Sequence, residues 1–120
     1  MSKPYDFGKA AENRAALFLE EKGYTVLARN FRYHKAEIDI IARKENILVV
    51  VEVKARSTPY FGPPESFIGK KKIGLLVQAA DHFVHVQGLD VNVRFDIISI
   101  LNYQGKCTVE HLEDAFYPFT

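Results

Sequence analysis

Glu52 and Lys54 are charged residues at positions where the core of a strand should continue. The five residues before Glu52, Ile47 to Val51, are all apolar. Side chains alternate along a strand, so Glu52 and Lys54 share a face with Leu48 and Val50. An ionised carboxylate on a largely buried strand costs several kcal/mol unless it is paired or bound to a metal. This pair is therefore the first candidate for chemistry.

The preceding strand carries a second pair of acids. Residues 36–42 read as a strand in which Glu37 and Asp39 share one face. If a loop of two or four residues closes the hairpin, Asp39 lies opposite Val50 and Glu37 opposite Glu52, with Asp39 diagonal to Glu52. A three-residue loop would put Asp39 and Glu52 on opposite faces. With an even loop, these acids and Lys54 crowd one face.

Crowded carboxylates on a poorly solvated face repel one another, and a hard cation relieves that repulsion. Mg²⁺ or Mn²⁺ fits, taking one or two carboxylates, waters and a substrate phosphate oxygen as ligands. Glu12 borders the buried stripe of the first predicted helix and can point toward Asp39 and Glu52. The cation would polarise the phosphate, while Lys54 would orient water or stabilise developing charge. The alternative is a salt-bridge ladder in which Lys54 neutralises Glu37 and Glu52.

The elements that position these residues follow from hydrophobic periodicity. A strand, a crossing helix and another strand imply a parallel, right-handed unit inside an otherwise antiparallel sheet. We therefore expect one α/β domain over residues 1–120, with a central mixed sheet of five strands flanked by two helices, in the order α-β-β-β-α-β-β. The expected helices are residues 8–22 and 70–86, and the expected strands are residues 24–31, 36–42, 47–55, 91–101 and 107–112.

Charge is distributed unevenly, although the net charge is only +1. The stretch from Arg29 to Lys72 holds ten Lys or Arg and five acids, and the rest of the chain to Thr120 holds two and six. A basic middle favours a polyanionic partner such as DNA; a solvated surface is the alternative. The residues predicted to contact nucleic acid are Arg56, Lys70, Lys71 and Lys72. The three lysines open the second helix, where a bound phosphate would offset their clash with the helix dipole.

Four further features bear on the fold and the function. One cysteine, Cys107, excludes an internal disulfide and suits a reducing compartment. The longest apolar run is too short to cross a bilayer, so we expect a cytoplasmic protein with no membrane association. Tyr60 and Phe61, in a loop rich in Pro and Gly, either stack on bases or anchor that loop. Arg94 and Asp96 share a face of the fourth strand and are interpreted as a structural pair.

Asp39, a spacer of twelve residues and then Glu52-Val53-Lys54 resembles the D…ExK signature of the restriction-endonuclease-like (PD-(D/E)xK) superfamily. A wider set of motifs resembles the YraN-like family of uncharacterised bacterial proteins, which is placed in the endonuclease-like fold close to archaeal Holliday-junction resolvases. These motifs are Gly8…Glu12…Ala16, Gly23-Tyr24, Asn30-Phe31-Arg32, Glu37-Ile38-Asp39, Val51 to Arg56, Phe61-Gly62 and Arg94-Phe95-Asp96.

The resemblance implies Asp39 and Glu52 as metal ligands and Lys54 as the catalytic lysine. Glu12 matches the helix acid of the resolvase pattern, an outer or second metal contact, while Glu37 receives no role. Two positions depart from the pattern: Ala36 replaces the usual glycine and Ile38 replaces the proline of the superfamily name. Neither removes a catalytic group.

Three hypotheses follow. The first is a Mg²⁺- or Mn²⁺-dependent endonuclease acting on DNA, on branched or damaged DNA in particular; a resolvase would need a homodimer to make paired cuts. The second is a nucleic-acid-binding module without turnover. The third is a protein-interaction domain whose carboxylates are structural.

Overall fold

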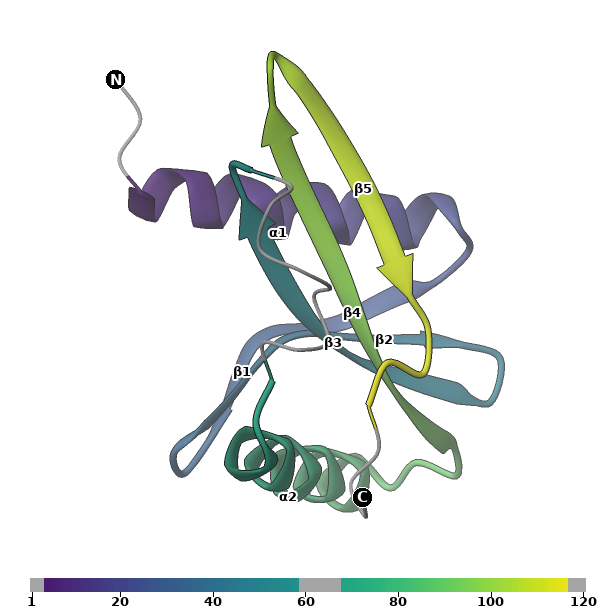
Figure 1. The fold of residues 1–120 in the computed structure, drawn as a ribbon. Coiled ribbons are helices and arrows are strands. Elements are labelled where there is room, and N and C mark those ends of the chain that lie inside the picture. The colour runs from purple at the N-terminus through teal and green to yellow at the C-terminus, as the bar shows by residue number, and fades with distance from the viewer. Residues whose placement is uncertain (1–3, 59–67, 117–120) are drawn as a thin grey trace.

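The computed structural model describes residues 4–58 and 68–116, so Tyr60 and Phe61 lie outside the described residues. The order of elements is α-β-β-β-α-β-β, as predicted (Figure 1). The largest difference in bounds is at the first helix, which begins at Pro4 rather than Gly8. The elements are α1 (Pro4–Glu21), β1 (Thr25–Tyr33), β2 (Ala36–Lys44), β3 (Ile47–Arg56), α2 (Lys70–Gln87), β4 (Asn92–Tyr103) and β5 (Lys106–Leu112).

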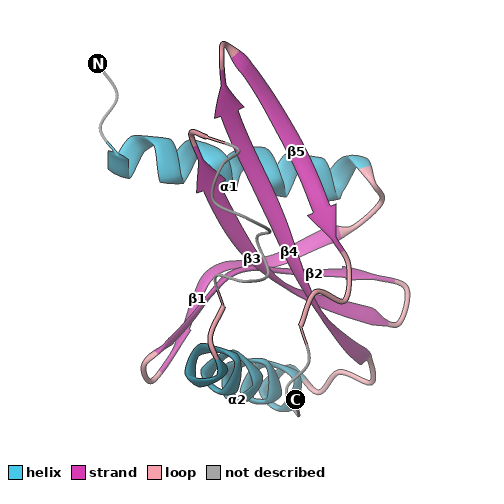
Figure 2. Ribbon diagram, viewed as in Figure 1, coloured by secondary structure: helices cyan, strands magenta, loops and turns pink. Residues whose placement is uncertain are grey.

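The five strands form one mixed sheet in the order β1-β2-β3-β4-β5, with tight turns joining the antiparallel neighbours (Figure 2). Only β3 and β4 are parallel, and α2 makes the crossover between them. Parallel neighbours cannot be joined by a short turn, so the crossover helix is required there. The predicted fold class, a mixed sheet with two helices, is therefore confirmed.

The helices cover opposite faces of the sheet and give it two hydrophobic layers (Figure 1). On β3, Val49 and Val51 pack in the layer with α1, while Leu48 and Val50 pack in the layer with α2. Strand β3 is buried on both faces because it contributes side chains to both layers, and this explains its continuous apolar run. Glu52 follows Val51 on this strand and therefore faces α2.

The β2–β3 hairpin closes through the two-residue turn Glu45-Asn46, in which Glu45 has φ 56°. The ladder pairs Ile40 with Val51 and Ile41 with Val50. The predicted register, with Asp39 opposite Val50, is therefore wrong by two residues. A shift of two residues does not by itself move any side chain to the other face of the sheet.

Strand β2 does not alternate regularly at Asp39. Ile38 packs with Ile41 in the α2 layer, whereas Ile40 packs in the α1 layer. Residues two apart in a regular strand would share a face. Asn30, near this point on the neighbouring β1, has φ 54°, a left-handed conformation that Asn tolerates better than most residues. The alternation of side chains between the two faces of the sheet is therefore interrupted at Asp39, where both strands are irregular.

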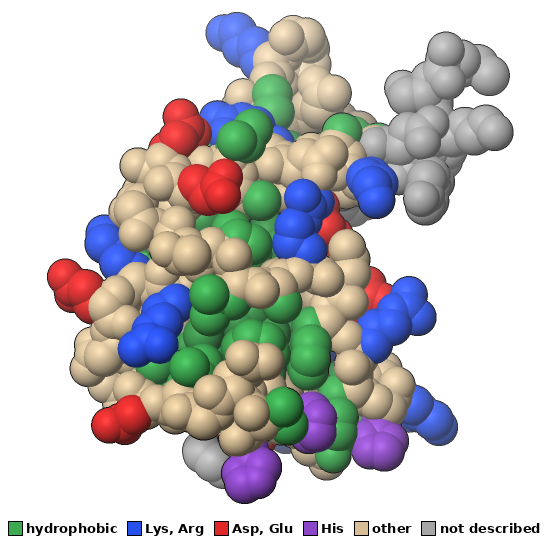
Figure 3. Space-filling model, turned by 180° about the vertical axis from the view of Figure 1, so that it is seen from behind, with side chains coloured by type: hydrophobic (Ala, Val, Ile, Leu, Met, Phe, Trp, Pro, Cys, Tyr) green, Lys and Arg blue, Asp and Glu red, His purple; other side chains and the backbone are tan. Residues whose placement is uncertain are grey.

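The surface is mixed in charge rather than uniformly basic. Figure 3 shows Lys and Arg side chains interspersed with acidic ones on the rear face, around a patch of hydrophobic side chains, with histidines gathered at one end. Within the described part of the chain, neither helix combines the length and apolar character of a membrane span. The positions of particular lysines, rather than the overall charge, therefore decide where a polyanion would bind.

Candidate metal-binding carboxylate site

The site lies where β2 and β3 separate. Their ladder runs from the turn to the pair Ile40–Val51, while the rest of β3, from Glu52 to Arg56, continues to pair with β4. Beyond the last pair, the backbone N–H of Val53 donates to Asp39 Oδ2 at 2.8 Å. A carboxylate thus satisfies a backbone donor that would otherwise lack a partner at this fork.

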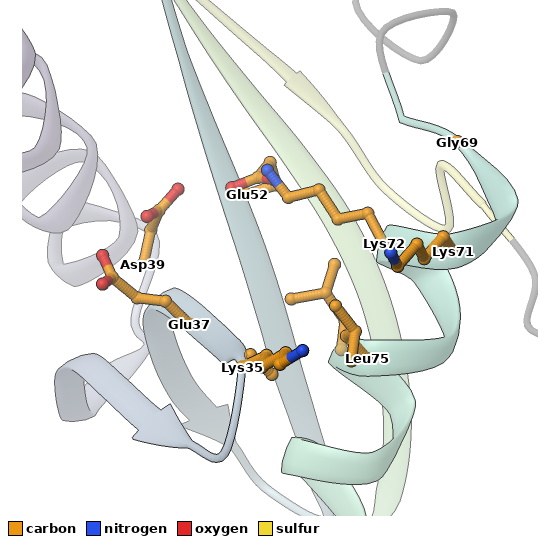
Figure 4. Close-up of a pocket in the computed structure, with 10 residues that line it drawn as sticks. Lys35, Glu37, Asp39, Glu52, Gly69, Lys71, Lys72 and Leu75 are labelled. Atoms are coloured by element: carbon orange, nitrogen blue, oxygen red, sulfur yellow. The ribbon is translucent and has the colours of Figure 1, made fainter.

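Glu52 is the most buried acid of the site. Its side chain is 5% exposed and forms an ion pair with Lys72 of α2 through Oε2. Figure 4 shows the Lys72 side chain reaching from the helix across to Glu52. Apart from this ion pair, Oε2 accepts no hydrogen bond from the described residues. The charge of Glu52 is therefore compensated, but its hydrogen-bonding capacity is not filled.

Asp39 and Glu52 influence each other directly. Burial, then a hydrogen bond shared with Glu52 and repulsion by its charge, raise the pKa of Asp39 to about 8, against the lowering effect of the Val53 N–H. Two carboxylates can share a hydrogen bond only when one of them holds a proton. The pair therefore binds a proton, or another cation in its place, near neutral pH.

Glu12 of α1 lies close enough to Asp39 for its charge to add to the rise in the pKa of Asp39. Its Oε1 accepts hydrogen bonds from Arg29 Nη2 and Asn30 Nδ2, each at 2.9 Å. Among the described residues, no three acid, His or Cys side chains converge closely enough to hold a metal. Glu12 is thus a neighbour held by β1, and the two facing carboxylates belong to Asp39 and Glu52.

A cavity of about 600 Å³ opens over these acids (Figure 4). It lies between the β1–β2 turn, the first residues of β2, Glu52 and the first turns of α2. Three lysines contribute to its wall, so a cavity with acids at its base has cationic sides. The lining residues are Lys35, Ala36, Glu37, Asp39, Glu52, Gly69, Lys71, Lys72, Leu75 and Leu76.

The other predicted residues take different positions. Lys54 follows Glu52 by two on β3, is partly buried, and does not line the cavity. Glu37 pairs with Arg32 at 2.9 Å. The alternative prediction, a salt-bridge ladder in which Lys54 neutralises Glu37 and Glu52, therefore names the wrong partners. Lys70 is exposed and lies outside the cavity wall, and Arg56 is partly buried near the end of β3.

The sequence analysis missed the role of Lys72. It placed three lysines at the start of the helix without distinguishing them. A signal was available: Lys72 precedes the buried residues Leu76, Ala79 and Phe83 at helical spacing, so it alone of the three continues the core-facing stripe. That spacing directs its side chain toward the sheet, where Glu52 lies.

The donor set fits a hard divalent cation. Mg²⁺ and Mn²⁺ bind through one or two carboxylates, with waters and phosphate oxygens completing the shell. Asp39 and Glu52 supply two such carboxylates in mutual contact, and Glu52 has an oxygen that lacks a hydrogen-bond donor among the described residues. These two residues would hold the metal, with Glu12 adding negative charge nearby.

A second buried acid belongs to a structural network. Asp96 is fully buried; it accepts hydrogen bonds from Arg94 at 2.8 and 2.9 Å and from the Asp114 N–H at 3.0 Å, and lies 2.7 Å from His111 Nε2. Lys22 Nζ lies 2.9 Å from His111 Nδ1. Since an ammonium only donates, Nδ1 accepts and Nε2–H donates to Asp96. The Arg94–Asp96 pair is structural, as interpreted from the sequence.

The fold and this site define a small α/β protein with paired carboxylates in a lysine-lined cavity. The chain belongs to the uncharacterised protein family UPF0102, whose model matches residues 11–100. It is similar to a UPF0102 protein of Flavobacterium psychrophilum, 49% identical over 119 residues, covering 99% of this chain and 100% of the relative. A UPF0102 protein of Bacteroides thetaiotaomicron is 45% identical, with 98% of each chain covered.

Proposed function

We propose that this protein is a metal-dependent endonuclease that hydrolyses phosphodiester bonds in DNA. The observation that carries the proposal is the contact between the Asp39 and Glu52 carboxylates in a cavity walled by lysines. Acids repel a polyanion, so a site built only for binding nucleic acid has no use for a buried carboxylate beside a partly buried one. In this cavity, the carboxylates at the base would bind a metal, and the lysines of the wall would bind phosphates.

Each residue of the site has its own role in this proposal, and its position determines that role. Asp39 and Glu52 would hold Mg²⁺ or Mn²⁺, which supplies Lewis-acid polarisation of the phosphate and a more acidic bound water. Lys71 lines the cavity and is placed to contact the phosphate backbone. Lys54 lies two residues beyond Glu52 on β3, and its ammonium would stabilise the charge that develops on phosphorus.

DNA as substrate, and branched or damaged DNA in particular, follows from the resemblance of the motifs to those of the junction-resolvase group. Paired cuts across a junction would require a homodimer that presents two such sites. Cleavage of a short DNA loop or flap would need only one such site. The oligomeric state in the presence of each DNA therefore separates these two modes of action.

The test is cleavage of labelled four-way junction, flap, nicked and linear DNA by wild type with Mg²⁺, Mn²⁺ or EDTA. We expect cleavage that requires metal and is lost in Asp39→Asn and Glu52→Gln. Lys54→Met should lower the rate by about 100- to 1,000-fold, the usual cost of removing one charge-stabilising group. Metal-dependent cleavage that survives both Asp39→Asn and Lys54→Met would contradict the proposal.

The ion pair between Glu52 and Lys72 favours a second candidate, a nucleic-acid-binding module without turnover, because it compensates the buried acid without a metal. That candidate predicts binding that weakens steeply with salt and no cleavage of any DNA in any metal. The same set of assays therefore separates the two functions.

A further inference from the structure

We propose that Lys72 is a resident cation that keeps a metal off Glu52 until a phosphate of the nucleic acid draws the lysine away. This inference rests on the proposed function and deepens it, because it couples metal binding to substrate binding. Its basis is the ion pair between Lys72 Nζ and Glu52 Oε2, an oxygen that a metal would need.

The two partners are unequal in their freedom to move. Glu52 is fixed on a central strand and its side chain is 5% exposed, whereas the Lys72 side chain is 44% exposed. A lysine carries its charge on a flexible four-carbon stem. Separation of the pair therefore means movement of Lys72 toward the cavity, while Glu52 stays in place.

Glu52 cannot lose its counter-charge without a replacement. A buried carboxylate left without a cation is strongly unfavourable, and the adjacent Asp39 makes the position more so. The ammonium and a divalent ion on the same carboxylate would also repel each other. Hence one cation exchanges for the other, and metal binding in the free protein works against the Lys72 contact.

A phosphate changes this balance. Lys71 and Lys72 both line the cavity in which the scissile strand would lie. A phosphate oxygen offers Lys72 a new anionic partner, so the lysine can leave Glu52 without losing its own ion pair. By thermodynamic linkage, DNA then tightens metal binding and metal tightens DNA binding by the same factor. Lys72 thus acts as a positioning residue that admits the metal together with substrate.

The experiment is titration of the intact protein with Mn²⁺, with free Mn²⁺ measured by electron paramagnetic resonance, in the absence of DNA. We expect Lys72→Met to bind Mn²⁺ about tenfold or more tightly than wild type, within the usual range of coupling between sites. Lys70→Met is the matched control, since Lys70 opens the same helix but lies outside the cavity wall, and it should bind as wild type does. Lys72→Arg keeps the cation and should restore the weak affinity.

Thermal unfolding without metal verifies that each variant is folded, and Lys72→Arg supplies a charge-retaining variant for comparison. Equal or weaker Mn²⁺ binding by Lys72→Met, beside measurable binding by wild type, would overturn the inference while leaving the metal site intact. Absence of Mn²⁺ binding in every variant, with or without DNA, would instead overturn the proposed function.

A second titration adds a short DNA duplex, whose integrity is verified on a gel afterwards. The duplex should tighten Mn²⁺ binding in wild type and have a smaller effect in Lys72→Met, where the competing cation is already gone. Equal tightening in both proteins, or none in wild type, would overturn the role of Lys72 in the coupling.

Discussion

The carboxylate of Asp39 accepts a hydrogen bond from the backbone N–H of Val53, with 2.8 Å between Oδ2 and N. The two residues lie on neighbouring strands just beyond the last ladder pair. This contact fixes the Asp39 side chain beside Glu52 and satisfies a backbone donor at the same time. A substitution at Asp39 must therefore keep an acceptor if it is to test the charge alone.

Asp39→Asn keeps that acceptor and removes the charge, so we expect the variant to be more stable than wild type in EDTA at neutral pH. The pKa of Asp39 rises from 3.8 to about 8 on folding. The folded state therefore binds the proton more strongly. The stability that this proton confers is complete below pH 3.8 and is lost as the pH rises through 8. Urea unfolding between these limits should show a falling stability in wild type and a flatter profile in the variant.

Asp81→Asn provides the matched control, because Asp81 is an exposed residue of α2. It makes the same chemical change away from the site, and its profile should follow wild type. A wild-type profile as flat as that of Asp39→Asn would show that Asp39 titrates normally.

Mn²⁺ should stabilise wild type and not Asp39→Asn. A ligand that binds only the folded state adds about 2.7 kcal/mol at a hundred times its dissociation constant. Thermal unfolding at increasing Mn²⁺ measures the gain, and Asp81→Asn should gain as wild type does. If Asp39→Asn gains equally, the metal binds elsewhere.

Asp96→Asn should be strongly destabilising, by about 3–5 kcal/mol, since it leaves the Arg94 cation without its buried partner. Burial raises the pKa of Asp96, but hydrogen bonds from His111, Arg94 and the Asp114 N–H outweigh this effect and hold the pKa below its ordinary value of 3.8. Its contribution is present above that pH and is lost as the pH falls.

Glu113→Gln is the comparison for Asp96. Glu113 also pairs with Arg94, at 3.3 Å, but its side chain is 51% exposed. An exposed ion pair contributes about 1 kcal/mol or less. Urea unfolding of both variants at neutral pH should separate them clearly; similar losses would mean that burial does not distinguish the two acids.

Asn30→Ala should destabilise the protein by about 1–2 kcal/mol, because alanine is strained in the left-handed conformation that Asn tolerates. The substitution also removes the hydrogen bond to Glu12. Asn30→Gly relieves the backbone strain but not the lost hydrogen bond, so it should lie between Asn30→Ala and wild type. Chemical denaturation measures all three, and equal stability of the alanine and glycine variants would exclude a backbone contribution.

Much of the fold followed from local patterns in the sequence. The apolar run of Ile47 to Val51 identified the central strand, and the helical spacing of Leu76, Ala80 and Phe83 identified the buried side of α2. Alternation alone placed Glu52 on the same face as Leu48 and Val50, and the structure shows that this face packs against α2. These properties depend on neighbours within a few residues, which periodicity records directly.

The remainder depended on geometry that no short segment contains. The register of β2 against β3 depended on where the turn fell, and Glu45 gives no clear turn signal. The irregular facing at Asp39 arises jointly from two strands, one of them carrying Asn30 at positive φ. The partner of Glu52 came from α2, beyond a crossover. Helical spacing distinguishes Lys72 from the two adjacent lysines, but only the three-dimensional packing shows that it reaches Glu52.

Strand order in the sheet is the same as strand order in the chain. Pairing between strands that are close together in the chain favours rapid folding. The parallel β3–β4 pair is the exception, because it forms only after the crossover between the two strands. Asp39 and Glu52 belong to a single hairpin, whereas Lys72 arrives with the crossover helix. A growing chain therefore brings its two acids together first, while water still solvates them, and acquires their counter-charge only when α2 docks and buries the site.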